Sequence, residues 1–186
     1  MTAVESKLGD ETMMAALALA LVEKPRATLQ ELAKSIGVSK ATLYRSCRTR
    51  EELVEKLMSY GAELMQRSLA TAALEDGTAE EALRRVIHSQ LEHREMGAFL
   101  TYHWKPDTLQ DERWFRVCAE FETALDAFFL RYQRAGYFRV DVSAAALTES
   151  LFSLIVCVID AERRGRIARG GMASVVESIF LTGAKS

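Results

Sequence analysis

Residues 28–50 read TLQELAKSIGVSKATLYRSCRTR and decide the fold of the chain. Thr28 and Glu31 have the T-x-x-E spacing of a capping box, in which the hydroxyl accepts from a helical backbone N–H and the glutamate reaches back. Gly37 can adopt the left-handed backbone conformation that ends a short helix. Ser39 supplies the N-cap oxygen of a second helix. The stretch therefore predicts two short helices joined by a tight turn, a helix-turn-helix.

The second predicted helix has an apolar side and a polar side. Leu43 is expected to pack inward with Val38 and Ile36. The side chains of this helix that are expected to face outward and meet a partner are Lys40, Thr42, Tyr44 and Arg45. We therefore interpret it as a recognition helix.

The pattern of the whole chain predicts an all-α fold. The chain has 186 residues, of which 49% are hydrophobic and 27% are charged. This composition is typical of a soluble globular protein. Only 2 prolines and 10 glycines interrupt the chain, and apolar residues recur every three or four positions rather than alternating. We expect about nine helices, over residues 10–24, 28–35, 40–46, 49–74, 78–94, 97–104, 111–134, 142–164 and 172–183.

Local signals mark where several of these helices begin and end. Asp10 and Asp141 are expected to cap the helices that follow them. Further T-x-x-E capping boxes begin at Thr49 and Thr78. In the helix at residues 111–134, the inward positions are expected to be Phe115, Cys118, Phe121, Leu125, Phe128 and Tyr132, with Gly136 ending the helix.

The charge of the chain is unevenly distributed. The formal net charge is -2, yet residues 24–50 carry seven basic residues against one acidic residue, a net of +6. Residues 51–186 carry 16 basic and 21 acidic residues, a net of −5. One end of the chain is therefore suited to meet phosphate.

The cysteines and the apolar runs favour a cytoplasmic protein without a membrane segment. Cys47, Cys118 and Cys157 are odd in number, widely spaced and without a C-x-x-C pair, so we expect no disulfide framework. The apolar run at residues 13–22 lacks the basic lead-in of a signal peptide. The run at residues 151–159 is too short to cross a bilayer, which takes roughly 20 residues.

The succession of a helix, a G-V-S turn, an A-T-L-Y helix and a T-R-E-E-L helix start resembles the DNA-binding domain of TetR-type transcriptional regulators. The resemblance extends over residues 10–57. It implies a three-helix DNA-binding head with the helix-turn-helix in residues 1–50, and a helical ligand-binding and dimerisation domain in residues 51–186. It also implies double-stranded DNA, a second copy of the chain and a small apolar or aromatic effector as partners, with repression as the expected mode.

The resemblance also assigns roles to residues of the head. Lys40, Ala41, Thr42 and Arg45 are expected to face bases, while Tyr44 directs its hydroxyl to a phosphate. The residues expected to hold the DNA backbone are Thr28, Ser46 and Arg50, and Ser39 acts mainly as a cap. The sequence departs from the family pattern in two places: Ala41 stands where glycine is common, and the pair Ser46 and Cys47 stands where an aromatic pair is usual. Cys47 is interpreted as packing, with a redox switch as the alternative.

A ligand site is predicted in the middle of the chain, where large side chains with polar tips gather. Such a mixture suits an apolar cavity with a few orienting donors, although aromatic residues at helical spacing also form ordinary cores. The candidates are His88, Phe99, His103, Trp104, Trp114, Cys118 and Phe121. We expect no metal site and no cofactor, because His88 and His93 are five apart and no third ligand is evident.

The predicted helix at residues 142–164 is apolar on nearly every side at its centre, which indicates burial on all sides. The R-A-G-Y-F-R-x-D elbow before it also resembles the TetR pattern, in which the last two helices pair with those of a second subunit. The residues predicted at this interface are Leu151, Leu154, Ile155, Val158, Val176, Ile179 and Phe180. A purely intrachain core is the alternative.

A second hypothesis is a small-molecule carrier or all-α enzyme whose helix-turn-helix is only structural. The sequence has no Gly-rich phosphate loop, no nucleophile elbow and no helical H-E-x-x-H, so no catalytic residue is predicted. The uneven charge favours the regulator, because a carrier has no need of it.

Overall fold

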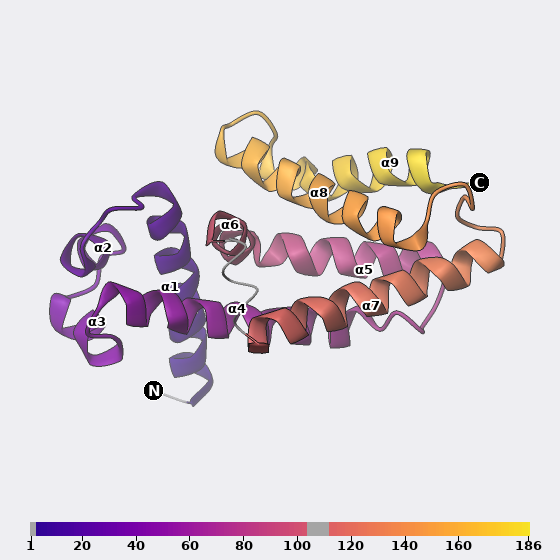
Figure 1. Cartoon of the computed structure of the whole chain (residues 1–186). Coiled ribbons are helices and arrows are strands. Elements are labelled where there is room, and N and C mark those ends of the chain that lie inside the picture. Colours follow the sequence, from indigo (N-terminus) through magenta and orange to yellow (C-terminus); the bar gives the residue numbers. More distant parts are fainter. Residues whose placement is uncertain (1–2, 104–111) are drawn as a thin grey trace. The chain divides into compact units, whose positions relative to one another are not determined.

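The computed structural model describes the backbone of residues 3–103 and 112–186, and the side chains of residues 10–103 and 115–186 (Figure 1). The described residues form nine α-helices and one 3-10 turn, without a β-strand, which confirms the all-α prediction. The helices are α1 (Ala3–Glu23), α2 (Leu29–Ser35), α3 (Lys40–Ser46), α4 (Arg50–Ala72), α5 (Ala79–Glu92), α6 (Arg94–His103), α7 (Glu112–Arg134), α8 (Ala144–Arg163) and α9 (Met172–Ala184), with the 3-10 turn at Arg169–Gly171.

The chain divides into two compact units. Unit 1 comprises residues 1–61 and 95–104, and unit 2 comprises residues 62–94 and 105–186. Helix α4 therefore begins in unit 1 and ends in unit 2, and nearly all of α6 belongs to unit 1. This division differs from the predicted boundary at residue 50, because the first three turns of α4 bury Leu53 and Leu57 in the core of unit 1.

Unit 1 is held by fully buried leucines from several of its helices, including Leu17 and Leu21 of α1, Leu32 of α2 and Leu43 of α3. Helix α6 approaches α4 closely, since a Cβ added at Gly61 would lie 2.8 Å from Cδ2 of Leu100. A glycine at this position therefore allows the two helices of unit 1 to pack together.

Two helix starts differ from the sequence prediction. Helix α1 begins at Ala3 rather than at Asp10, because only Gly9 weakens the helix before that point. Helix α8 is capped by Ser143, whose hydroxyl accepts from the backbone N–H of Ala146 at 3.2 Å. Asp141, the predicted cap, instead pairs with the guanidinium of Arg139.

The capping box predicted at the start of α4 is only half formed. The Thr49 hydroxyl accepts from the backbone N–H of Glu52 at 3.1 Å. The Glu52 carboxylate, however, accepts from the backbone N–H of Arg48 at 2.6 Å. The boxes predicted at Thr28 and Thr78 are complete.

Unit 2 is centred on aromatic rings where α7, the elbow after it and α9 meet. Phe138 of the elbow is fully buried, with its ring centroid 5.1 Å from that of Phe129 and 4.8 Å from that of Tyr137. The backbone N–H of Arg139 donates to the carbonyl of Ala184 at 2.9 Å, which attaches the elbow to the end of α9. Gly136 has a φ of 76° and ends α7 as predicted.

The outer face of α7 includes Phe115, which was predicted to face inward. Its side chain is exposed, because Val117 takes the inward position and a residue two places earlier points to the far side of the helix.

Helix α8 packs against α5, α7 and α9, and Figure 1 shows α8 and α9 side by side. Five of the residues predicted to meet a second copy are therefore buried within this chain: Leu151, Ile155, Val158, Val176 and Phe180. They form part of the core of unit 2 and are corrected to that role. Leu154 is half-buried and Ile179 is 57% exposed, so these two remain available to a partner.

Among the described residues, α8 is the one helix long and apolar enough, by length and composition, to cross a membrane, with a mean hydropathy of 1.8 over an 18-residue window. Only 39% of that window is buried inside the chain. The core helix of a soluble protein passes the same test. Helix α8 is therefore an apolar helix that its own chain covers only in part.

Replacing Phe138 by alanine is predicted to lower the free energy of unfolding by about 3 to 5 kcal/mol, because a large buried ring leaves a cavity among other rings. Urea unfolding followed by circular dichroism measures the change. Val140→Ala is the control, since Val140 is 78% exposed two residues away. Its truncation should cost less than about 0.5 kcal/mol. Equal effects of the two substitutions would contradict the central role of the aromatic cluster.

Candidate nucleic-acid interface

The helix-turn-helix has the geometry that its sequence predicts. The Thr28 hydroxyl accepts from the backbone N–H of Glu31 at 3.3 Å, and the Glu31 carboxylate accepts from the backbone N–H of Thr28 at 2.8 Å. The hydrogen bonds that Thr28 donates hold the pKa of Glu31 below its ordinary value. Gly37 has a φ of 74° in the turn, and the Ser39 hydroxyl caps α3 by accepting from the backbone N–H of Thr42 at 3.0 Å.

Helix α3 is anchored by Leu43, which is fully buried, and by Cys47 at its C-terminal end, which is also buried. The thiol of Cys47 lies 3.6 Å from the carbonyl oxygen of Leu43. This burial supports the interpretation of Cys47 as packing, and it gives the redox alternative no support.

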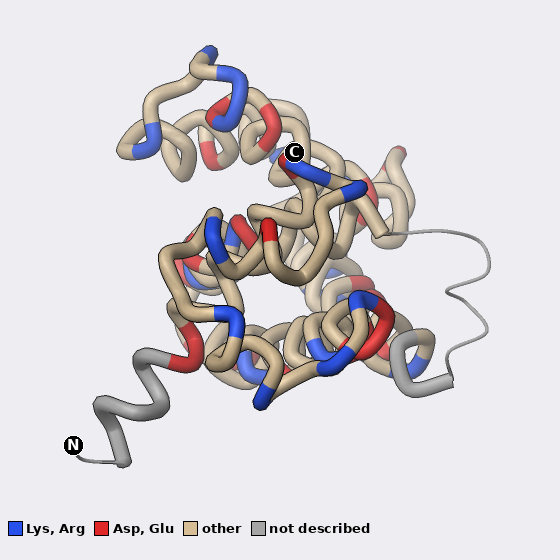
Figure 2. The backbone as a smooth tube through the Cα atoms, turned by 90° about the vertical axis from the view of Figure 1, so that its left-hand side faces the viewer, with Lys and Arg blue, Asp and Glu red and all other residues tan. Residues whose placement is uncertain are grey.

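The opposite side of α3 is open to solvent. Lys40, Ala41, Tyr44 and Arg45 are exposed, and Thr42 is half-exposed. The ammonium of Lys40 lies 5.1 Å from the centroid of the Tyr44 ring, a cation–π distance that favours one orientation of both side chains. The lysine and arginine positions along the backbone are marked in blue in Figure 2. The residues predicted to face bases thus lie on one short helix.

The hydroxyl groups predicted to hold phosphate already have partners in unit 1. The Thr28 hydroxyl donates to the Glu31 carboxylate at 2.8 Å, and the Ser46 hydroxyl donates to the carbonyl of Leu43 at 2.8 Å. A hydroxyl has one proton to donate, so donation to a phosphate requires these groups to rotate away from their present acceptors. Their assignment to the DNA backbone stays a prediction.

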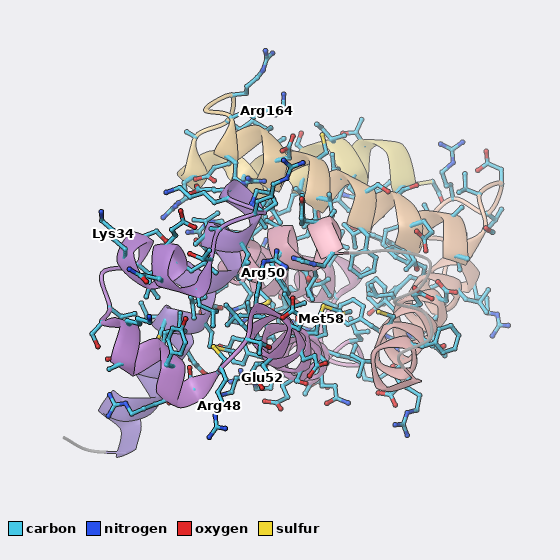
Figure 3. All side chains as sticks on the ribbon, turned by 60° about the vertical axis from the view of Figure 1, so that its left-hand side comes forward. Lys34, Arg48, Arg50, Glu52, Met58 and Arg164 are labelled. Carbon is cyan, nitrogen blue, oxygen red and sulfur yellow. The ribbon has the colours of Figure 1, made fainter. Side chains whose placement is uncertain are left out.

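Arg50, also predicted to hold phosphate, has a structural role in unit 1. Its guanidinium donates to the carbonyl of Pro25 at 2.7 Å, which ties the first residue of α4 to the loop between α1 and α2. The residue is half-buried, so its side chain is committed to the fold of unit 1. By contrast, Arg48 extends away from the ribbons into solvent (Figure 3).

An open groove of about 870 Å³ lies in unit 1, beside α2. It is lined by Lys24, Pro25, Arg26, Ala27, Glu31, Lys34, Ser35 and Tyr102. Lys24, Arg26 and Lys34 are the three cations of this lining, and the sequence alone identified them only as members of the basic segment at residues 24–50. Tyr102 belongs to α6, and no sequence signal placed it beside the helix-turn-helix.

The residues predicted to bind a ligand fall in both units. Phe99 and His103 belong to unit 1, where Phe99 is fully buried and the ring centroids are 4.4 Å apart. His88 and Phe121 belong to unit 2, where His88 is exposed beside Glu177 and Phe121 is buried against Phe152 with centroids 5.2 Å apart.

Cys118, the other described member of this predicted set, is half-buried in unit 2. Burial, with a smaller contribution from the charge of Glu122, raises its pKa to about 11, so its thiol stays protonated at neutral pH. Trp104 and the side chain of Trp114 lie outside the described residues.

A polar pocket of about 370 Å³ lies between α4 and α5 in unit 2, and His88 and His93 contribute to its lining. Ser68 is the buried residue of the lining, and its hydroxyl accepts from the Ser89 hydroxyl at 2.7 Å and from the Gln90 amide at 3.0 Å. Within the described ranges, no cluster of three His, Cys, Asp or Glu side chains is arranged to hold a metal ion.

Comparison with known proteins gives a family match over the helix-turn-helix. Residues 15–57 match the family described as bacterial regulatory proteins, tetR family. The HTH-type transcriptional regulator NfxB of Pseudomonas aeruginosa is 44% identical over 181 residues, which cover 95% of each chain. The HTH-type transcriptional repressor LfrR of Mycolicibacterium smegmatis is 31% identical over 111 residues, or 58% of each chain.

Two solved structures are similar over almost the whole chain. PfmR, a TetR family transcriptional regulator from Thermus thermophilus, has a TM-score of 0.69 at 23% identity, and the match covers 92% of this chain and 97% of PfmR. LfrR in complex with proflavine has a TM-score of 0.66 at 24% identity, covering 94% of both chains. At this level of identity the likeness concerns the fold.

Arg50→Ala is predicted to destabilise unit 1 by about 1 kcal/mol, because it removes the charged donor that ties the carbonyl of Pro25 to α4. Arg48→Ala is the matched control, since it removes the same charge two residues earlier from a solvated position and should change stability by less than about 0.5 kcal/mol. Urea unfolding compares the two variants. If the Arg50→Ala protein is as stable as the control, the hydrogen bond from Arg50 to Pro25 does not stabilise unit 1.

Proposed function

The chain belongs to the tetR family of bacterial regulatory proteins, and we propose that it works as a homodimeric repressor that a small molecule releases from DNA. As a member of this family it is a DNA-binding transcriptional regulator. Repression is proposed because LfrR, a relative of this chain, is described as a transcriptional repressor. The cytoplasm is the proposed compartment, because the proposed DNA partner lies there.

The observation that carries the proposal is the exposed side of α3. A recognition helix reads bases from its N-terminal residues in the major groove. Lys40 and Arg45 suit guanine, and the methyl groups of Ala41 and Thr42 suit the methyl group of thymine. Tyr44 is proposed to donate to a phosphate, a contact that positions the helix without reading sequence.

The effector is proposed to act on unit 2. LfrR has been crystallised with proflavine, an aromatic molecule, and this supports an aromatic effector here. In unit 2 the half-buried ring of Phe152 lies against the buried ring of Phe121, with centroids 5.2 Å apart, and Cys118 lies three residues before Phe121. Helix α4 begins at the helix-turn-helix and ends in unit 2, so we propose that it transmits the change.

The homodimer is proposed to form through α8 and α9. Helix α8 is apolar but incompletely covered, and a second copy burying the same face would complete its burial. Ile179 and Val156, both exposed, are proposed to lie in this interface with the half-buried Leu154. Two heads would then bind half-sites about one helical turn apart, or a multiple of it.

Titration of the purified protein onto DNA from its own promoter tests the function. We expect an affinity that depends on sequence and falls steeply with salt concentration. Lys40→Ala should lose about 1 to 3 kcal/mol of base discrimination at one position of each half-site, if Lys40 reads a base. Arg48→Ala is the control that removes the same charge without changing base preference. An affinity that depends neither on the DNA sequence nor on the salt concentration would overturn the proposal.

Ile179→Asp is predicted to convert the dimer into a monomer, because it places a charge in an apolar interface. Sedimentation velocity at micromolar protein concentration measures the change. Val140→Asp introduces the same charge at an exposed position of the elbow and should leave the dimer intact. A wild-type protein that sediments as a monomer, or two variants that behave alike, would reject the α8 and α9 interface.

A further inference from the structure

We propose that the polar pocket between α4 and α5 binds a small organic molecule through its carboxylate group. The pocket has a volume of about 370 Å³ and belongs entirely to unit 2. It is a site separate from the aromatic pair of Phe121 and Phe152, because no residue of α7 or α8 lines it. Its lining is formed by Arg67, Ser68, Thr71, Arg85, His88, Ser89, Glu92 and His93.

Helical spacing brings the polar side chains of the pocket together. On α4, Ser68 and Thr71 are three residues apart, and on α5, Arg85, Ser89 and Glu92 follow each other at intervals of four and three. Side chains at these intervals lie on one face of a helix. Two polar helix faces therefore meet at the pocket, and its volume lies within the range of sites for small ligands.

The hydroxyl of Ser68 is a buried donor in this lining, since the residue is only 4% exposed. Its oxygen accepts from the Ser89 hydroxyl at 2.7 Å and from the Gln90 amide at 3.0 Å. These two bonds occupy both lone pairs, so the proton is what remains to be bonded. Across the described residues that proton has no acceptor, whereas Thr71 donates its own proton to the carbonyl of Arg67 at 2.8 Å. A ligand oxygen in the pocket would satisfy the buried donor.

Arg85 adds a half-buried positive charge to the pocket. Its Nε donates to the carbonyl of Ala72 at 2.7 Å, and its Nη2 donates to the carbonyls of Ala73 and Asp76 at 2.9 and 2.6 Å. Carbonyl oxygens bring no net charge, and within the described ranges no carboxylate lies at ion-pair distance from Arg85. A guanidinium without a counter-ion is a preferred partner of a carboxylate.

The balance of charge selects a ligand with a single negative charge. Arg67 and Arg85 stand against Glu92, which gives the lining a net charge of +1 with neutral histidines. Glu92 is exposed, so water and salt screen its repulsion of an anion. A carboxylate matches this charge, and its two oxygens can accept from Ser68 and from a guanidinium together. The remaining hydroxyl and imidazole groups suit a polar ligand body.

An occupant of this pocket would join α4 to α5. Helix α4 begins at the helix-turn-helix and ends in unit 2, so the occupant would bear on the helix proposed to transmit the effector response. That consequence rests on the proposed function, whereas the binding of the carboxylate does not.

Thermal unfolding tests the binding, with lactate as the probe and lactamide as its neutral counterpart at constant ionic strength. At ten times its dissociation constant, lactate is expected to raise the Tm of the wild type by roughly 3 to 6 °C, and lactamide is expected to leave it unchanged. Ser68→Ala removes the buried donor and should abolish the shift. Ser178→Ala is the matched control, since it removes an exposed hydroxyl of α9 and should keep the full shift.

Arg67→Gln is a second variant of the lining, because Ser68→Ala also deprives Ser89 and Gln90 of their acceptor and can destabilise unit 2. It keeps the buried hydroxyl and removes one exposed charge. We expect the Arg67→Gln protein to fold and to bind lactate several-fold more weakly than the wild type.

Absence of a shift in the wild type, equal shifts with lactate and lactamide, or equal responses of Ser68→Ala and Ser178→Ala would overturn the proposal. These measurements contain no DNA, so their failure is distinct from a failure of the proposed function, which the promoter titration decides. In that titration, a change of DNA affinity on adding lactate that Ser68→Ala abolishes would support the link from the pocket to α4. An unchanged DNA affinity would contradict that link.

Discussion

Helix α3, the proposed recognition helix, depends on the burial of one side chain, Leu43. Helix α3 has seven residues. A helix of this length does not persist alone in water, because isolated helices become stable only beyond about 12 residues. Leu43 is fully buried and supplies the tertiary contact that propensity cannot. With the Ser39 cap fixing where the helix begins, the exposed side chains of α3 are held in one orientation.

The rest of unit 1 maintains that contact. Helix α2 starts at a complete capping box, and Arg50 fastens the loop before α2 to the start of α4. Helix α6 joins the same unit through the close approach of Leu100 to Gly61. Since α4 continues into unit 2, a change there has a covalent route to the residues that support α3. This is the physical basis on which the proposed effector response rests.

Local signals predicted much of this fold. The capping boxes at Thr28 and Thr78 and the left-handed Gly37 depend on residues within four positions of each other, so sequence spacing is sufficient to recognise them. The bond from Arg50 to Pro25 joins residues 25 positions apart, and no local pattern indicates it. The family resemblance placed Arg50 at a phosphate, and that resemblance gives no indication of the hydrogen bond from Arg50 to Pro25.

The buried residues of α8 and α9 show the same limit of prediction from local sequence patterns. An apolar stripe indicates that a helix face is covered, but it does not say whether the cover is the same chain or a second copy. Leu151 and Ile155 were assigned to a partner and are covered by their own chain, whereas Ile179 is exposed. The sequence also could not predict that Tyr102 lines the groove beside α2, because the grouping of α6 with unit 1 depends on tertiary contacts.

Hydroxyl-radical footprinting of the protein on its promoter DNA tests the central claim most directly, namely that α3 of each copy enters a major groove. The account predicts two protected segments on one face of the duplex, with centres separated by about 10 base pairs or a multiple of it. A single protected segment, or uniform weak protection along the duplex, would contradict it.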